Sequence, residues 1–338
     1  MKPTFHHRPV NGPFEDPCLY IRLLREKRAI LFDLGSIERL SPGDINKITD
    51  VFVTHTHIDH FIGFDHLLRN ILGRPVPLRI YGPSNIIDCV RGKLSGYAWN
   101  LISGYPLKIE AFGISESEMR HVSFHAANAF APVERGSKKK PFAGAVLKET
   151  YFRVDAAILT HDIDCLAFSI EEDYHINIDK AALTSLGLEV GPWLTDFKKK
   201  IRGNAPENGA IRVSGKEFTI GELKKKIAMI TRGQKVSYAM DSSPTPENIE
   251  KIKSLARGAD TLYSEGYFLH ADFERARERN HLTADLAGSI ASEAGARELV
   301  LMHCSPKYLH REDKLLEEAR RAFSSGPVSI SPGPVPRP

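Results

Sequence analysis

The sequence is poor in cysteine and has no long apolar run. Its 338 residues include four cysteines, Cys18, Cys89, Cys165 and Cys304, which are far apart and form no C-x-x-C pair. This spacing argues against both a disulfide framework and a cysteine zinc site. No apolar run is long enough to span a bilayer, and the opening "MKPTFHHRPVNGPFEDP" lacks the apolar segment of a signal peptide. We therefore expect a cytoplasmic protein with reduced thiols.

The composition is that of a globular protein, and its positive charge is clustered. Apolar residues make up 42% of the chain and charged residues 26%, with a formal net charge of +4. Lysine triplets occur at 138–140, 198–200 and 224–226. Such triplets are compatible with solvated surfaces and equally with attraction of a polyanion such as nucleic acid.

The order of apolar patterns predicts two sheets covered by helices. Two alternating series of strands and helices flank a middle region, 121–172, that is strand-like throughout. This order predicts an α/β protein with an αββα four-layer sandwich, as one domain over residues 1–338. A doubly wound sheet is the alternative, but no G-x-G-x-x-G follows the first strand. The expected strands are 19–24, 29–35, 51–55, 78–82, 121–128, 145–154, 156–161, 165–172, 235–240, 261–265 and 298–303. The expected helices are 61–72, 84–94 (with Ser84 as its cap), one associated with "SSPTPENIEKIKSLA" (242–256), 283–295 and 311–323.

One segment interrupts this order. Residues 178–226 are rich in glycine, lysine and proline and contain only short helical patterns. We interpret them as an inserted basic arm.

The stretch "VFVTHTHIDH" (51–60) places three histidines and an aspartate directly after a strand. His55 and His57 are two residues apart and can point to the same side, while Asp59 and His60 follow in the turn before a helix. Imidazole nitrogen suits zinc, and carboxylate suits zinc, manganese or iron. The stretch therefore predicts ligands for one or two metal ions.

Three further polar residues end apolar runs elsewhere. His161 ends "AAILTH", Asp241 follows "KVSYAM", and His303 ends "ELVLMH". Each alone is compatible with a buried, hydrogen-bonded side chain. Together they predict that ligands at the ends of several strands converge into one site for two metal ions.

The metal-ligand pattern resembles the signature of the metallo-β-lactamase fold, and three other segments resemble the ribonuclease Z branch of that fold. "VSYAMDSSPTPENI" is similar to the branch's "sGDTrp" strand end, and "NHLTADLAGSIASEAGARELVLMHCSPKY" to its "gHsTa…LiLtHfSpRY" run. "ALTSLGLEVGPWLTDFKKKIRGN" (182–204) resembles its exosite segment. The resemblance extends over residues 29–310.

The resemblance implies roles for individual residues. One metal would be held by His55, His57 and His161, the other by Asp59, His60 and His303, with Asp241 bridging. His281 matches the catalytic histidine, and Glu265 falls at the glutamate of the family's "HEAT" motif, where it would orient His281. Asp59 is also a candidate proton acceptor.

Some segments depart from the family pattern. "FDLGSIERL" replaces "FDcGEGtq", "SEGY" replaces "HEAT", and "MDSS" replaces "GDTR". No stretch like the family's opening "FLGTG" strand precedes residue 19.

The resulting hypothesis is an endoribonuclease that removes the 3′ trailer of precursor tRNA by attack of a metal-bridging hydroxide. We expect two divalent ions, zinc or else manganese or iron, a homodimer, and contacts of the basic arm with tRNA. The first alternative is a phosphodiesterase for small cyclic or diester phosphates on the same scaffold. The second is a non-catalytic RNA-binding protein.

Overall fold

A computed structural model describes residues 4–24, 26–133 and 141–332, and it divides into two compact units. The larger unit comprises residues 5–146, 154–170 and 235–338, and the smaller comprises 1–4, 147–153 and 171–234. The lysine triplet at 138–140 lies outside the described residues. Among the described helices, none is long and apolar enough to cross a membrane.

The first large sheet has eight strands in the order in which they occur along the chain. Its first three strands are antiparallel, and the third to sixth run parallel to one another. Antiparallel strands then complete the far edge. The strands are β1 (Phe5–Pro9), β2 (Leu19–Leu23), β3 (Arg28–Phe32), β4 (Ile48–Phe52), β5 (Leu78–Pro83), β6 (Lys108–Ile114), β7 (Met119–His125) and β8 (Pro132–Val133).

The second large sheet has seven strands in the order β19-β18-β17-β16-β11-β10-β9. The strands β16 to β19 are parallel, so their carboxyl ends meet at one edge. They are β9 (Ala145–Lys148), β10 (Phe152–Thr160), β11 (Asp164–Glu172), β16 (Lys235–Ala239), β17 (Thr261–Glu265), β18 (Leu299–Met302) and β19 (Val328–Ile330).

Aromatic side chains fill the space between the two sheets. The ring of Phe168, from the second sheet, lies 5.6 Å from that of Phe32 and 5.5 Å from that of Phe52 in the first. Tyr238 completes the contact, 5.7 Å from Phe32. All four side chains are buried, so apolar surface is removed from water on the facing sides of both sheets.

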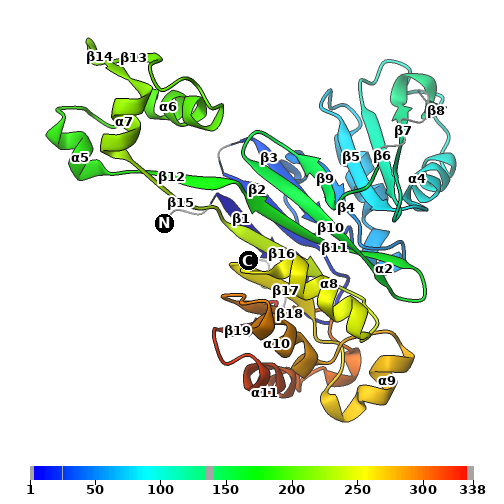
Figure 1. Ribbon diagram of the computed structural model, residues 1–338. Coiled ribbons are helices and arrows are strands. Elements are labelled where there is room, and N and C mark those ends of the chain that lie inside the picture. The colour runs from blue at the N-terminus through cyan, green and yellow to red at the C-terminus, as the bar shows by residue number, and fades with distance from the viewer. Residues whose placement is uncertain (1–3, 25, 134–140, 333–338) are drawn as a thin grey trace. The chain divides into compact units, whose positions relative to one another are not determined.

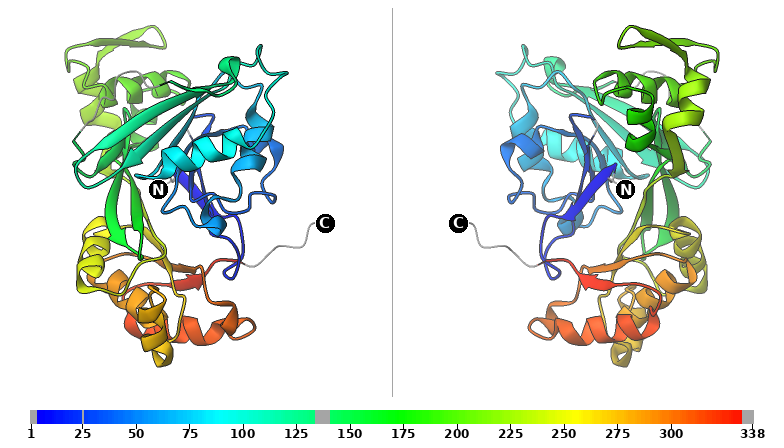
Figure 2. Two further views of the ribbon diagram at one scale, coloured as in Figure 1. Left: turned by 90° about the vertical axis from the view of Figure 1, so that its right-hand side faces the viewer. Right: turned by 90° about the vertical axis from the view of Figure 1, so that its left-hand side faces the viewer.

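Helices cover the two outer faces (Figure 1). Apolar residues of α3 and α4 join those of the first sheet in one buried cluster, and α8, α10 and α11 do the same on the second. Figure 2 shows the helices of the C-terminal third gathered beside one another. This layering confirms the predicted α/β sandwich. The helices are α1 (Pro42–Ile45), α2 (Ile58–Phe61), α3 (Phe64–Ile71), α4 (Ile86–Ser95), α8 (Pro246–Ala256), α9 (Phe273–Glu278), α10 (Ala284–Glu293) and α11 (Glu312–Ala322), with short 3₁₀ turns at Ala126–Asn128, His270–Asp272 and Pro306–Tyr308.

Two local features differ from the sequence-based expectation. A strand, β1, precedes the first strand expected from the sequence, 19–24. Its residues "FHHRP" do not resemble "FLGTG", and it forms because its backbone pairs with β2. The expected cap Ser84 lies outside α4, which begins after Asn85 and has no side-chain cap hydrogen bond.

The smaller unit contains the whole of the inserted arm, residues 178–226. A two-stranded ribbon, β12 (Tyr174–Ile178) paired with β15 (Ala228–Arg232), leads to three helices and a hairpin. Their apolar side chains, including Leu183, Phe197 and Leu223, form a separate buried cluster. Trp193 packs against this cluster and donates to the carbonyl of Glu189 at 3.0 Å. The elements are α5 (Lys180–Ser185), α6 (Trp193–Arg202), β13 (Ala210–Val213), β14 (Lys216–Thr219) and α7 (Ile220–Ile227).

Candidate metal centre

The histidine-rich turn lies between β4 and α2 of the larger unit. His55 is buried just beyond the strand, and His57 is the N-cap residue that directly precedes α2. Asp59 and His60 follow within that one-turn helix. The short loop thus presents four ligand-type side chains to the same end of the sandwich.

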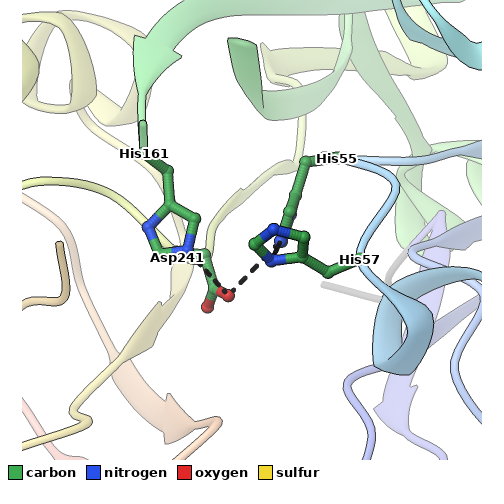
Figure 3. Close-up of side chains that lie close together, drawn as sticks. All are labelled: His55, His57, His161 and Asp241. Atoms are coloured by element: carbon green, nitrogen blue, oxygen red, sulfur yellow. Dashed lines mark hydrogen bonds and ion pairs between the residues drawn. The ribbon is translucent and has the colours of Figure 1, made fainter. Parts of the chain in front are cut away.

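A first group of metal-ligand atoms is formed by His55, His57, His161 and Asp241 (Figure 3). The Nε2 atom of His55 lies 2.9 Å from Nδ1 of His57 and 3.5 Å from Oδ2 of Asp241. The Nε2 atom of His161 lies 3.7 Å from the same carboxylate oxygen. One ligand atom from each of the four residues falls within 4.8 Å of all the others, which is the convergence that a bound cation requires.

A second group lies on the other side of Asp241. It consists of Asp59, His60 and His303, whose ligand atoms also converge within 4.8 Å. His60 Nε2 is 3.3 Å from Oδ2 of Asp241, and His303 Nδ1 is 2.6 Å from Oδ1. His303 Nε2 reaches Oδ2 of Asp59 at 3.2 Å. The Asp241 carboxylate therefore stands between the two groups.

The backbone at this edge is unusual. Asp241 and His303 each have a φ of +47°, and Asp33 has +57°. Few residues other than glycine adopt this left-handed region, and such positions gather at functional sites. Here the conformation turns the chain sharply where β16, β18 and β3 end, so that the side chains face the common edge.

Asp33 is a site residue that the sequence reasoning missed. Its buried carboxylate lies 2.8 Å from Nδ1 of His60, and it accepts hydrogen bonds from the backbone N–H of Thr54 at 2.7 Å and from the hydroxyl of Tyr238 at 3.0 Å. It fixes the direction of the His60 ring. The signal was available, because Asp33 follows the apolar run "AILF" just as Asp241 follows "KVSYAM".

The orientation of the His161 ring is likewise fixed by a contact at the ring nitrogen that faces away from Asp241. Its Nδ1 lies 2.7 Å from the carbonyl oxygen of Asn280, so its Nε2 is left to face Asp241. The left-handed backbone of Asn280, with φ of +59°, brings that carbonyl into reach. The neighbouring His281 is positioned by the same turn.

The electrostatics of the centre fit divalent cations. Burial alone would lower the pKa of His60, but the Asp33 and Asp241 carboxylates raise it to about 10. The same two effects, burial opposed by Asp241, leave the pKa of His303 well above its usual range. Among the described residues, the buried Nε2 of His60 has no hydrogen-bond partner. The site thus favours positive charge, and a divalent cation bound there would supply that charge in place of the proton on Nε2 of His60.

His55 behaves differently from His60. Burial, and then the charge of His60, lower the pKa of His55 to about 2. Its imidazole is therefore neutral, which is the form that ligates a metal.

His281 and Glu265 form a pair next to the second group. The Nδ1 atom of His281 lies 2.8 Å from Oε2 of the fully buried Glu265 and 3.8 Å from Oδ1 of Asp241. The His281 ring centre is 5.0 Å from that of His161. The other carboxylate oxygen of Glu265 accepts from the backbone N–H of Ser242 at 2.8 Å. The structure thus brings His281 and Glu265 together with the seven candidate ligands.

Comparison with solved structures defines the class of protein. No family model matches the chain. A metallo-β-lactamase-fold protein, YhfI from Bacillus subtilis, superimposes with a TM-score of 0.57 at 19% identity, covering 97% of each chain. The short form of human tRNase Z superimposes with a TM-score of 0.54 at 18% identity, covering 97% of this chain and 96% of that one. The protein therefore has the metallo-β-lactamase fold.

Sequence comparison gives the family. The chain is 31% identical over 328 residues to the ribonuclease Z of Enterococcus faecalis, covering 94% of this chain and 88% of that protein. The protein belongs to the ribonuclease Z family, and it is a hydrolytic enzyme. The alternative of a phosphodiesterase for small diesters is not favoured by these relatives.

Proposed function

We propose that the protein is a metal-dependent endoribonuclease that removes the 3′ trailer of precursor tRNA in the cytoplasm. The observation that carries the proposal is the convergence of seven ligand-type side chains beside the His281–Glu265 pair, in a chain of the ribonuclease Z family. A non-catalytic RNA-binding protein would need neither the ligands nor the pair.

The proposed ligands are divided between two divalent ions. His55, His57 and His161 would hold one, and Asp59, His60 and His303 the other, with Asp241 shared. Imidazole and carboxylate ligands in these numbers fit zinc, with manganese or iron as alternatives. Bound there, the two ions would supply an activated water and neutralise charge on the phosphoryl oxygens.

Two side chains of the protein would transfer protons, one as acceptor and one as donor. In our proposal Asp59, held by His303 at 3.2 Å, accepts a proton from the attacking water. His281 donates a proton to the departing 3′-oxygen of the upstream nucleotide. Glu265 accepts from Nδ1–H of His281, which leaves Nε2 as the donating atom.

The arm, residues 178–226, supplies the proposed contact with the body of the tRNA. The last turn of α6 carries Lys199 and Lys200, and that of α7 carries Lys224, Lys225 and Lys226, whereas Arg202 at the end of α6 pairs with the buried Glu172 at 3.0 Å. Basic side chains at the ends of two helices suit phosphates of the RNA backbone. We further propose a homodimer, as the family resemblance implies, which light scattering would test.

The test compares two substrates on the same zinc-loaded protein. We expect cleavage of a precursor tRNA at a single position near the mature 3′ end, together with slower hydrolysis of bis(p-nitrophenyl) phosphate. Cleavage of the small ester alone would overturn the assignment of precursor tRNA as the substrate.

A further inference from the structure

Tyr267 lies face to face with His281. Its ring centre is 3.9 Å from that of the imidazole, and the two planes differ by only 5°. Two backbone hydrogen bonds hold the tyrosine in place: its N–H donates to the carbonyl of Leu282 at 3.1 Å, and its carbonyl accepts from the N–H of Ser305 at 3.1 Å. The stacked partner is therefore tied to the residue next to His281 and to the segment that follows His303.

The His281 ring is constrained from two directions. Glu265 binds Nδ1 in the plane of the ring, whereas Tyr267 covers one face. A single hydrogen bond at Nδ1 leaves the ring able to tilt about that bond. A parallel aromatic neighbour opposes this tilt, because tilting separates the two faces. The hydrogen bond and the stack together fix the direction in which Nε2 points.

We propose that Tyr267 is a positioning residue that holds the imidazole plane of His281 so that Nε2 faces the departing 3′-oxygen. The inference rests on the proposed function, in which His281 is the proton donor. It concerns a feature of this chain, since "SEGY" stands where the family motif ends in threonine, a residue with no aromatic face. The stack also leaves Tyr267 only 5.2 Å, centre to centre, from His303, so a test must separate positioning from damage to the metal centre.

The choice of leaving group separates these effects. A ribose 3′-oxygen needs a proton as it departs, whereas p-nitrophenolate is stable and departs without one. Misplacing His281 therefore slows cleavage of precursor tRNA and has little effect on bis(p-nitrophenyl) phosphate. Loss of a metal slows both reactions.

The experiment measures kcat and KM of zinc-loaded wild type, Tyr267→Thr, Tyr267→Leu and Tyr267→Phe on both substrates. Leucine fills the space without an aromatic face, and phenylalanine keeps the face without the hydroxyl. Tyr105→Thr, an exposed position in the larger unit, is the matched control. We expect kcat on precursor tRNA to fall roughly two- to tenfold in the threonine and leucine variants, with KM unchanged, and to be largely restored by phenylalanine.

A readout independent of turnover follows the ring itself. In ¹H–¹⁵N spectra of the imidazoles, assigned with a His281→Gln variant, the ring-current shift of the His281 signal should disappear in Tyr267→Thr and persist in Tyr267→Phe. The zinc content of each variant is measured alongside.

Three results would overturn the inference. They are unchanged kcat on precursor tRNA in both the threonine and leucine variants, equal loss on both substrates, and a phenylalanine variant as slow as the threonine variant. Failure of the proposed function gives a different result, because wild type itself would then leave precursor tRNA intact while its His281 signal still showed the shift.

Discussion

Nδ1 of His60 lies 2.8 Å from the buried Oδ2 of Asp33, on the side of the ring opposite the metal centre. This contact fixes the orientation of the His60 ring, so that only its Nε2 atom faces Asp59 and Asp241. Asp33 is itself fixed by Thr54 and Tyr238, so the orientation is transmitted from the core between the two sheets.

Replacing Asp33 by asparagine tests this relationship. Asparagine tolerates the left-handed backbone at position 33 but removes the charge that holds His60. We expect metal affinity to fall roughly 10- to 100-fold, as measured by competition with a fluorescent chelator. Asp88→Asn, an exposed position on α4, is the control and should bind metal as wild type does. Wild-type affinity in the Asp33 variant would mean that the contact does not orient a ligand.

Replacing Asp241 by alanine should lower metal occupancy of both groups, because this carboxylate lies within 3.7 Å of nitrogen atoms from each. Elemental analysis after dialysis measures the bound metal. Asp241→Asn, which suits the left-handed backbone better, separates the loss of the ligand from backbone strain. Two full equivalents of metal in either variant would contradict the bridging role.

Replacing His281 by alanine should leave metal content and RNA affinity unchanged but reduce single-turnover cleavage of precursor tRNA roughly 10²- to 10⁴-fold, the range for a lost acid–base group. The control is His270→Ala, an exposed histidine of the same unit. Near-normal cleavage in the His281 variant would remove this residue from the mechanism.

The basic ends of the arm helices should determine the salt dependence of tRNA binding. We expect Lys225→Ala/Lys226→Ala, which removes two exposed charges from α7, to reduce the slope of log affinity against log salt by about two units. Hydrolysis of bis(p-nitrophenyl) phosphate should be unaffected. The matched control, Lys314→Ala/Arg321→Ala on α11, removes the same charge from the other unit. An identical slope in the two double variants would mean that the arm has no special part in binding.

The lowered pKa of His7 leads us to expect a smaller free energy of unfolding in weak acid. Burial, and then the charge of His6, lower the pKa of His7 to about 4, and its Nδ1 lies 2.7 Å from the hydroxyl of Tyr263. Because the unfolded chain binds the proton more tightly, stability should decline as the pH falls from about 6.5 towards 4, by at most about 3 kcal/mol. Urea titrations of wild type and His7→Gln at pH 7 and pH 4.5 measure the effect. An equal decline in both proteins would assign the acid sensitivity to other groups.

Much of the fold and the candidate site could be predicted because both depend on local patterns. Apolar runs ending in a polar residue located His161, Asp241 and His303, and the structure places all three at one edge. Strand β1 could not be predicted, since its existence depends on pairing with β2 rather than on its own residues. The place of Asp33 after an apolar run was visible in the sequence, but its role as a support for His60 was not, because that role depends on a contact across 27 positions of sequence.

The stacking of Tyr267 on His281 also lay beyond sequence reasoning. The substitution in "SEGY" was visible, but the direction of the tyrosine ring depends on backbone hydrogen bonds to Leu282 and Ser305, which only the folded chain provides.

The left-handed backbone at Asp33, Asp241 and His303 sets a limit on how this protein can be stabilised. At each of these positions glycine would relieve conformational strain yet remove a side chain from the centre. Selection for thermal stability alone would therefore favour glycine at these positions and yield stable variants without activity. Variants chosen for thermal stability must be assayed for catalysis in parallel.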